Sequence, residues 1–188
     1  MKTAVLVLAL MIAGAARAES CHTHAPAAPP RTPSAVSSIP DVKVVTQEGK
    51  SVDFYSDLIK GKVVAVNFVF TTCTTVCPPL GAIFGKLQEQ QPGARLISVS
   101  IDPEVDTPAR LKAWSGKFGA RPGWTLVTGK KDDIVRLLKA MNAYSPDFAN
   151  HQPVTLVGND ATGTWKRSYG FTTAAKLAVM LNELEKGS

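Results

Sequence analysis

Apolar runs alternate with amphipathic segments along most of this 188-residue chain. The longest apolar run, residues 62–70, is rich in Val and Phe, as expected of a strand buried on both faces. Further strands are predicted over residues 95–101, 124–127, 154–157 and 164–168. Helices are predicted over residues 79–90, from a cap at Asp106 or Thr107 to Phe118, and over residues 131–141 and 172–186. Strands that alternate with helices in this way indicate an α/β domain.

The start of this domain has a different pattern. Two short apolar segments, residues 42–45 and 51–54, flank a turn that contains Gly49, which predicts an N-terminal β-hairpin. Residues 55–60 predict a short helix that stops at Gly61. We therefore expect an α/β fold whose central mixed sheet is flanked by helices and preceded by a hairpin, built from residues 41–188.

The first 40 residues are not typical of a folded core. Lys2, an apolar run over residues 4–14 and the small-x-small pattern Ala16-Arg17-Ala18 predict a signal peptide at residues 1–18 that is cleaved near Ala18. The alternative is a retained anchor that leaves the domain in the periplasm, attached to the membrane. Residues 19–40 are rich in Pro, Ala, Ser and Thr, which predicts a flexible linker.

Composition excludes several classes of protein. Hydrophobic residues make up 45% of the chain and charged residues 19%, which is typical of a globular protein rather than a disordered one. The formal net charge is +6, but no block of like charges indicates a nucleic-acid partner. The mature chain is expected to lack a stable membrane span and to be a monomer.

The clearest chemical signal is a pair of cysteines at the end of the longest apolar run. Cys73 and Cys77 are separated by three residues, and Pro78 and Pro79 follow them. A helix is expected to begin at Pro79, where a missing backbone N–H costs nothing. Cys77 would then lie at the helix entrance, where the helix dipole lowers a thiol pKa.

Two thiolates prefer soft ions such as Cu(I), but they need at least one more ligand. Of the three histidines, His22 and His24 fall in the predicted linker, and only His151 precedes a predicted strand of the domain. Two other readings need only the sulfurs: a redox-active pair, or a permanent structural disulfide. Redox-active cysteine pairs usually have two intervening residues, whereas Cys73 and Cys77 have three, which weighs against the redox-active pair.

Three sequence blocks together resemble the Sco/SenC family of thioredoxin-fold copper proteins, which assist cytochrome c oxidase assembly. The blocks are residues 70–78, residues 98–108 and Asn150-His151. The resemblance implies a thioredoxin-like fold and a copper site formed by Cys73, Cys77 and His151, holding Cu(I), Cu(II) or both. It also implies a periplasmic chaperone, rather than an enzyme, that delivers copper to a cuproprotein client, the copper centre of cytochrome c oxidase.

This chain departs from the family pattern at two positions: Asn150 replaces an acidic residue, and Thr74 replaces a proline. Pro153 occupies a place where thioredoxin-like folds often hold a cis proline. The rival hypotheses are a thiol–disulfide oxidoreductase that reduces client cysteines through Cys73 and Cys77, and a redox or copper sensor. A thiol reductant is a further expected partner, because the periplasm is oxidising.

Two other groups of residues are candidates for weaker roles. Asp102 and Asp106 fit turn formation and helix capping better than metal ligation. The cluster Cys21-His22-Thr23-His24 in the predicted linker contains copper ligands and is a candidate second copper site. A peroxiredoxin-type peroxidase is disfavoured, because Phe70 stands where such a site needs Thr.

Overall fold

The computed structural model describes residues 36, 38–147 and 151–187, all within one compact unit, Pro33–Ser188. The predicted signal peptide, the Cys21-His22-Thr23-His24 cluster and Asn150 lie outside the described residues. None of the described helices is both long and apolar enough to cross a bilayer. No cis peptide bond occurs among the described residues, so Pro153 is trans.

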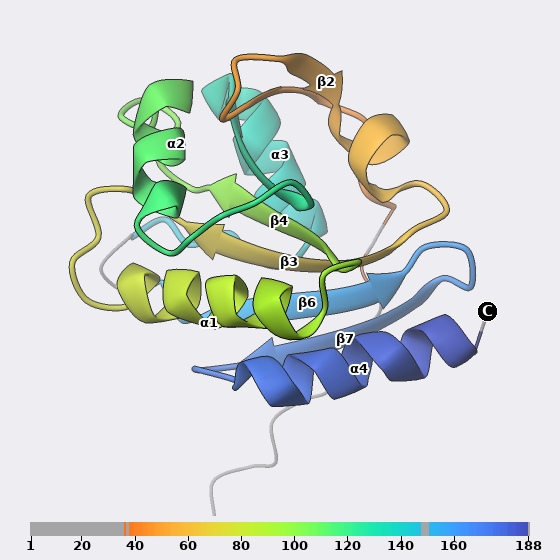
Figure 1. The fold of residues 1–188 in the computed structure, drawn as a ribbon. Coiled ribbons are helices and arrows are strands. Elements are labelled where there is room, and N and C mark those ends of the chain that lie inside the picture. Colours follow the sequence, from red (N-terminus) through yellow and green to blue (C-terminus); the bar gives the residue numbers. More distant parts are fainter. Residues whose placement is uncertain (1–35, 37, 148–150, 188) are drawn as a thin grey trace, which may run out of the picture. The chain divides into compact units, whose positions relative to one another are not determined.

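The centre of the unit is a seven-stranded mixed sheet, with strand order β2-β1-β5-β4-β3-β6-β7 (Figure 1). The strands are β1 (Lys43–Thr46), β2 (Ser51–Asp53), β3 (Val63–Val69), β4 (Arg95–Ser100), β5 (Trp124–Gly129), β6 (Val154–Asn159) and β7 (Thr164–Tyr169). β3, β4 and β5 are mutually parallel, whereas β6 is antiparallel to β3. The carboxyl end of β3 and the start of β6 therefore lie at the same edge of the sheet.

Within the described residues, four α-helices and one π-helical turn complete the fold. They are η1 (Phe54–Ile59), α1 (Cys77–Gln90), α2 (Pro108–Gly116), α3 (Lys131–Ala140) and α4 (Ala174–Lys186). The predicted hairpin is formed by β1 and β2, and η1 ends where Gly61 adopts a φ of 68°. The predicted architecture, a mixed sheet flanked by helices and preceded by a hairpin, is therefore confirmed.

Side chains of β3 alternate between two hydrophobic cores, one on each face of the sheet. Val66 and Phe68 enter the core that α3 covers, and Ala65 and Val69 enter the core that α1, α2 and α4 cover. Figure 1 shows α1 and α4 side by side over this second face. With both faces covered, the strand can be apolar throughout, which is the pattern its sequence has.

The predicted start of the first long helix is wrong by two residues. Helix α1 begins at Cys77, not at Pro79, although a residue before proline usually avoids the helical region. Pro78 and Pro79 fit here because N–H groups of a first helical turn need no intrahelical partner. The Leu80 N–H donates to the Val76 carbonyl at 3.4 Å, which closes this turn.

Candidate metal centre

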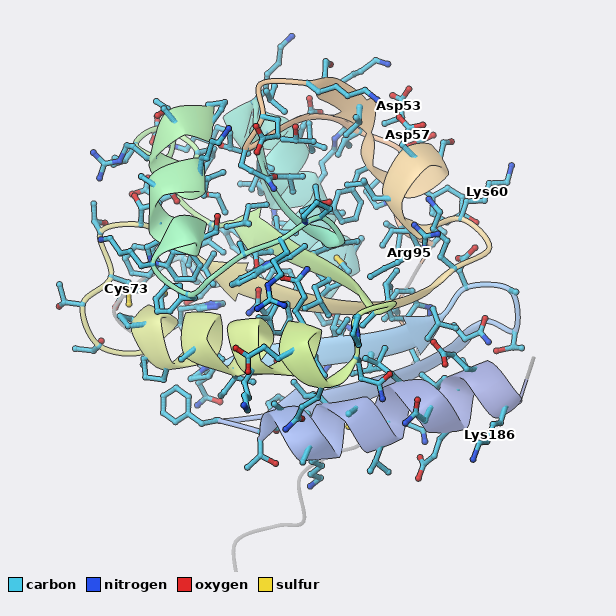
Figure 2. The ribbon with its side chains drawn as sticks, in the orientation of Figure 1. Asp53, Asp57, Lys60, Cys73, Arg95 and Lys186 are labelled. Atoms are coloured by element: carbon cyan, nitrogen blue, oxygen red, sulfur yellow. The ribbon has the colours of Figure 1, made fainter. Side chains whose placement is uncertain are left out.

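The cysteine loop, residues 70–76, connects the carboxyl end of β3 to the start of α1. The Cys73 N–H donates to the Phe70 carbonyl at 3.2 Å, so the chain turns sharply as it leaves the strand. Cys77, the first residue of α1, follows four residues later. Figure 2 shows Cys73 at this end of the sheet, in the loop before α1.

The fold brings the two cysteines together as free thiols. The Cys77 N–H donates to the Cys73 sulfur at 3.2 Å, and Thr75 Oγ1 lies 4.0 Å from the same sulfur. Cys77 is fully buried, whereas Cys73 retains 9% of its surface. Both cysteines are therefore buried, and Cys73 is the one that keeps some exposed surface.

The same geometry gives the two thiols opposite acidities. Burial alone would raise the pKa of Cys73, but hydrogen bonds from the Cys77 thiol and from backbone N–H groups outweigh it, so the pKa falls. For Cys77, burial raises the pKa strongly, and the nearby Cys73 and Asp106 raise it further. As pH rises, the first thiolate of this pair therefore forms at Cys73.

The expectation that the helix start would lower the Cys77 pKa is thus wrong. The Cys77 N–H at the start of α1, with the Thr75 and Val76 N–H groups just before it, stabilises the Cys73 thiolate, as helix N–H groups do for an N-cap side chain. Cys77 lies inside the first turn, where desolvation dominates. The start of the helix does lower a thiol pKa, but the thiol is that of Cys73 rather than Cys77.

Asp106 fixes the position of the cysteine loop from the neighbouring strand. Its carboxylate is 1% exposed and accepts hydrogen bonds from the Thr71 N–H at 3.1 Å and from the Thr71 and Ser100 hydroxyls. Arg110 Nε also donates to Thr71 Oγ1, at 3.1 Å. The loop is therefore held to the β4–α2 connection two residues before Cys73.

His151 lies at the same edge of the sheet but against the other core. It precedes β6 by three residues, and β6 runs antiparallel to β3, so the His151 backbone lies near the start of the cysteine loop. Its ring packs edge-on against Phe68 of the core under α3, with centroids 6.4 Å apart. The imidazole thus contacts the opposite face of the sheet from the sulfurs.

The imidazole is buried and incompletely paired. His151 is 6% exposed, and burial lowers its pKa, with a hydrogen bond to the Phe68 backbone acting in the opposite direction. Its Nε2 atom is buried and has no hydrogen-bond partner among the described residues. An unpaired, uncharged imidazole nitrogen is the form that binds a metal ion.

Two cavities of about 270 Å³ each border His151. One is lined by residues of the β4–α2 connection and α3, including Asp102 and Glu104. The other is lined by Tyr144, Arg167 and Tyr169. The ring therefore has unfilled space beside it.

The structure thus brings together two of the three predicted ligands. Cys73 and Cys77 are in contact, and His151 comes to the same sheet edge without joining them. Among residues 38–147 and 151–187, no group of three His, Cys, Asp or Glu side chains is arranged to hold a metal ion.

Sequence reasoning missed the role of Asp106. It assigned Asp106 or Thr107 to capping α2, and Thr107 alone caps it, accepting from the Arg110 N–H at 3.3 Å. Once Thr107 is taken as the cap, Asp106 is a charged residue with no local partner, and this signal could have indicated a longer-range role.

The profile of the SCO1/SenC family matches residues 32–163, and the chain belongs to this family. The SCO1 protein homolog of Bacillus subtilis (strain 168) is 38% identical over 88 residues, 44% of this chain and 45% of that protein. A protein of Stutzerimonas stutzeri described as copper-binding is 30% identical over 109 residues, 55% of this chain and 52% of that protein. The matches span about half the length of these curated relatives.

The fold agrees with this assignment. The solved structure of BsSco, described as a member of the Sco family of cytochrome c oxidase assembly proteins with a disulfide switch, superimposes with a TM-score of 0.69 at 24% identity. The superposition covers 84% of this chain and 99% of that chain. The fold is therefore thioredoxin-like, as expected.

Proposed function

We propose that this protein is an exported copper chaperone. Cys73, Cys77 and His151 bind the ion, and ligand exchange passes it to a cuproprotein, the copper centre of cytochrome c oxidase. The predicted signal peptide supports a periplasmic location. Copper is the cargo here, and no bond in an organic substrate is made or broken.

The contact between the two sulfurs at the carboxyl end of β3 carries this proposal. Cys73 is the less buried of the two and has the lower pKa, so it can take the ion first, and Cys77 loses its proton as the metal binds. Two thiolates and one imidazole are a donor set suited to copper. The copper-binding relative of Stutzerimonas stutzeri supports the same cargo.

Completion of the site requires His151 to leave Phe68. The unpaired Nε2 makes the buried position costly, because a buried nitrogen without a partner loses its hydration, at about 1–3 kcal/mol. Binding to copper would satisfy this atom. The ion therefore provides the free energy that moves the imidazole around the sheet edge.

A copper titration of the reduced protein tests this site. Wild-type protein is expected to develop sulfur-to-copper charge-transfer absorption at one equivalent of Cu(II). His151→Ala should weaken Cu(II) binding by at least tenfold, and the exposed neighbour substitution Gln152→Ala should not. Equal affinity in the His151→Ala and wild-type proteins would refute the three-ligand site.

A second function, thiol–disulfide exchange, is favoured by one observation. A partly exposed thiol of lowered pKa beside a fully buried thiol of raised pKa is the arrangement of an attacking and a resolving cysteine. In this reading Cys73 attacks a client disulfide, and Cys77 then displaces the client from the mixed disulfide. His151→Ala should leave this exchange rate unchanged, which separates the two functions.

A further inference from the structure

Exposed apolar side chains gather around the cysteine loop. Among the described residues, five large hydrophobic side chains are exposed: Val105, Tyr144, Tyr169, Phe171 and Val179. Val105, Tyr169 and Phe171 belong to segments at the sheet edge that holds the cysteine loop, and Tyr144 lines a cavity there together with His151 and Tyr169. Val179 lies instead on the outer side of α4. We call Val105, Tyr144, Tyr169 and Phe171 the apolar rim.

The sheet order places the rim on both sides of the sulfurs. Val105 lies in the connection after β4, which Asp106 ties to the cysteine loop. Tyr169 ends β7 opposite Val154, three residues after His151, and Phe171 follows it. Figure 1 shows the β3–α1, β4–α2 and β7–α4 connections at this one edge. The cysteine loop therefore lies between Val105 on one side and Tyr169 and Phe171 on the other.

Two segments between Val105 and the aromatic side chains of the rim carry no charge. Residues 63–85 and 168–175 contain no Asp, Glu, Lys or Arg, in a chain with 36 such residues. Within these segments Thr72, Thr74 and Thr75 are exposed. Depletion of charge combined with exposed Tyr and Phe is typical of the core of a protein–protein interface.

The nearest exposed side chains beyond the uncharged segments include two cations. Arg110 contacts Thr71 from α2, and Lys176 lies in the first turn of α4. Neither forms an ion pair with a carboxylate of the described chain, unlike Lys131, which pairs with Glu104. An uncharged centre flanked by unpaired cations complements a partner whose contact surface is apolar and whose periphery is acidic.

We propose that the apolar rim is the docking surface for the copper-accepting protein, which presents an uncharged surface around its own copper ligands and carboxylates around that surface. This inference rests on the proposed function. Ligand exchange requires the acceptor's ligands to reach Cys73, the cysteine that keeps some exposed surface, and the rim lies around the loop that carries it. Docking there excludes water from the ion during the exchange.

The test uses the recombinant soluble copper domain of cytochrome c oxidase as the probe. Its affinity for the reduced, metal-free protein is measured by calorimetry, and the rate of copper transfer by stopped-flow absorption. Phe171→Ser and Val105→Ser, on opposite sides of the cysteine loop, should each weaken binding and slow transfer about tenfold. Val179→Ser, an equally exposed position on α4, should change both by less than twofold. Copper affinity and thermal midpoint should stay unchanged in all three variants.

Several outcomes would overturn the docking surface. Unchanged affinity in Phe171→Ser and Val105→Ser is one, and an equal loss in Val179→Ser is another. Rim-dependent self-association in sedimentation, or rim-dependent binding to phosphatidylglycerol vesicles without binding to the copper domain, would assign the rim to a second copy or to a membrane. Failure of the proposed function would be seen separately, as absence of copper binding by the wild-type protein.

Discussion

At the scale of single residues, the two cysteines are chemically unequal although they are four positions apart. Backbone N–H groups that surround the Cys73 sulfur stabilise its negative charge, whereas Cys77 has no exposed surface. For the Cys77 thiolate, the free-energy cost of desolvation exceeds the stabilisation that the helix N-terminus provides. The metal or a partner disulfide is therefore expected to meet Cys73 first.

This inequality predicts selective alkylation. Because the Cys73 pKa is below the ordinary value, its reaction rate with iodoacetamide should fall less than that of an ordinary thiol as pH falls from 8.5 to 7. Cys77, with a raised pKa and no exposed surface, should react at least tenfold more slowly throughout this range. Fragmentation mass spectrometry of the peptide that contains both cysteines measures the two rates. Equal rates, or faster reaction at Cys77, would contradict the assignment.

At the scale of elements, the cysteine loop depends on a contact between two strand ends. Asp106, after β4, accepts hydrogen bonds from donors of Thr71 and Ser100, and all of these groups are at least partly buried. Each donor would lose its partner if the carboxylate were removed. The loop that carries Cys73 is thus held from the neighbouring connection as well as by α1.

Asp106→Ala should therefore lower the free energy of unfolding by roughly 3 kcal/mol, since unpaired buried donors lose both hydration and a charged acceptor. Urea unfolding of the reduced protein measures this loss. Asp132→Ala removes an exposed carboxylate from α3 and should cost no more than about 1 kcal/mol. Similar losses in the two variants would show that the Asp106 network does not stabilise the fold.

Most elements could be predicted from the sequence, because each has a strong local signal. The apolar run of β3 and the Thr107-Pro108 cap of α2 are examples. The start of α1 was placed wrongly because local proline preference was overridden by hydrogen bonds from Leu80 to Val76 and from Cys77 to the Cys73 sulfur. Those partners become visible only when the loop is folded.

For the candidate site, the sequence could predict which segments lie together, but not how their side chains are oriented or buried. Two cysteines after a buried strand and a histidine before another strand indicated a common sheet edge, and the topology has that arrangement. Which face each side chain occupies depends on the side-chain alternation of β3 and on the packing of His151 against Phe68. Burial of Cys77 likewise depends on contacts with residues distant in sequence, so its pKa shift had no local signal.

At the scale of the whole molecule, copper binding and folding are linked if the three ligands belong to different parts of the fold. The cysteines lie at the β3–α1 connection, and His151 lies before β6, so the unfolded chain cannot hold all three in place at low cost. A ligand that binds only the folded state raises the free energy of unfolding by about 2.7 kcal/mol at 100 times its Kd. The two sulfurs alone are local and would produce a smaller effect.

Copper at this excess should therefore raise the thermal midpoint of the reduced protein by roughly 5–10 °C, measured by circular dichroism. The increase should shrink by at least half in His151→Ala, because that variant keeps only the two neighbouring sulfurs. Protein with a Cys73–Cys77 disulfide should show no increase, since neither sulfur is then a thiolate. An equal increase in all three proteins would show that the stabilising copper binds elsewhere on the chain. It would thereby contradict copper binding by Cys73, Cys77 and His151.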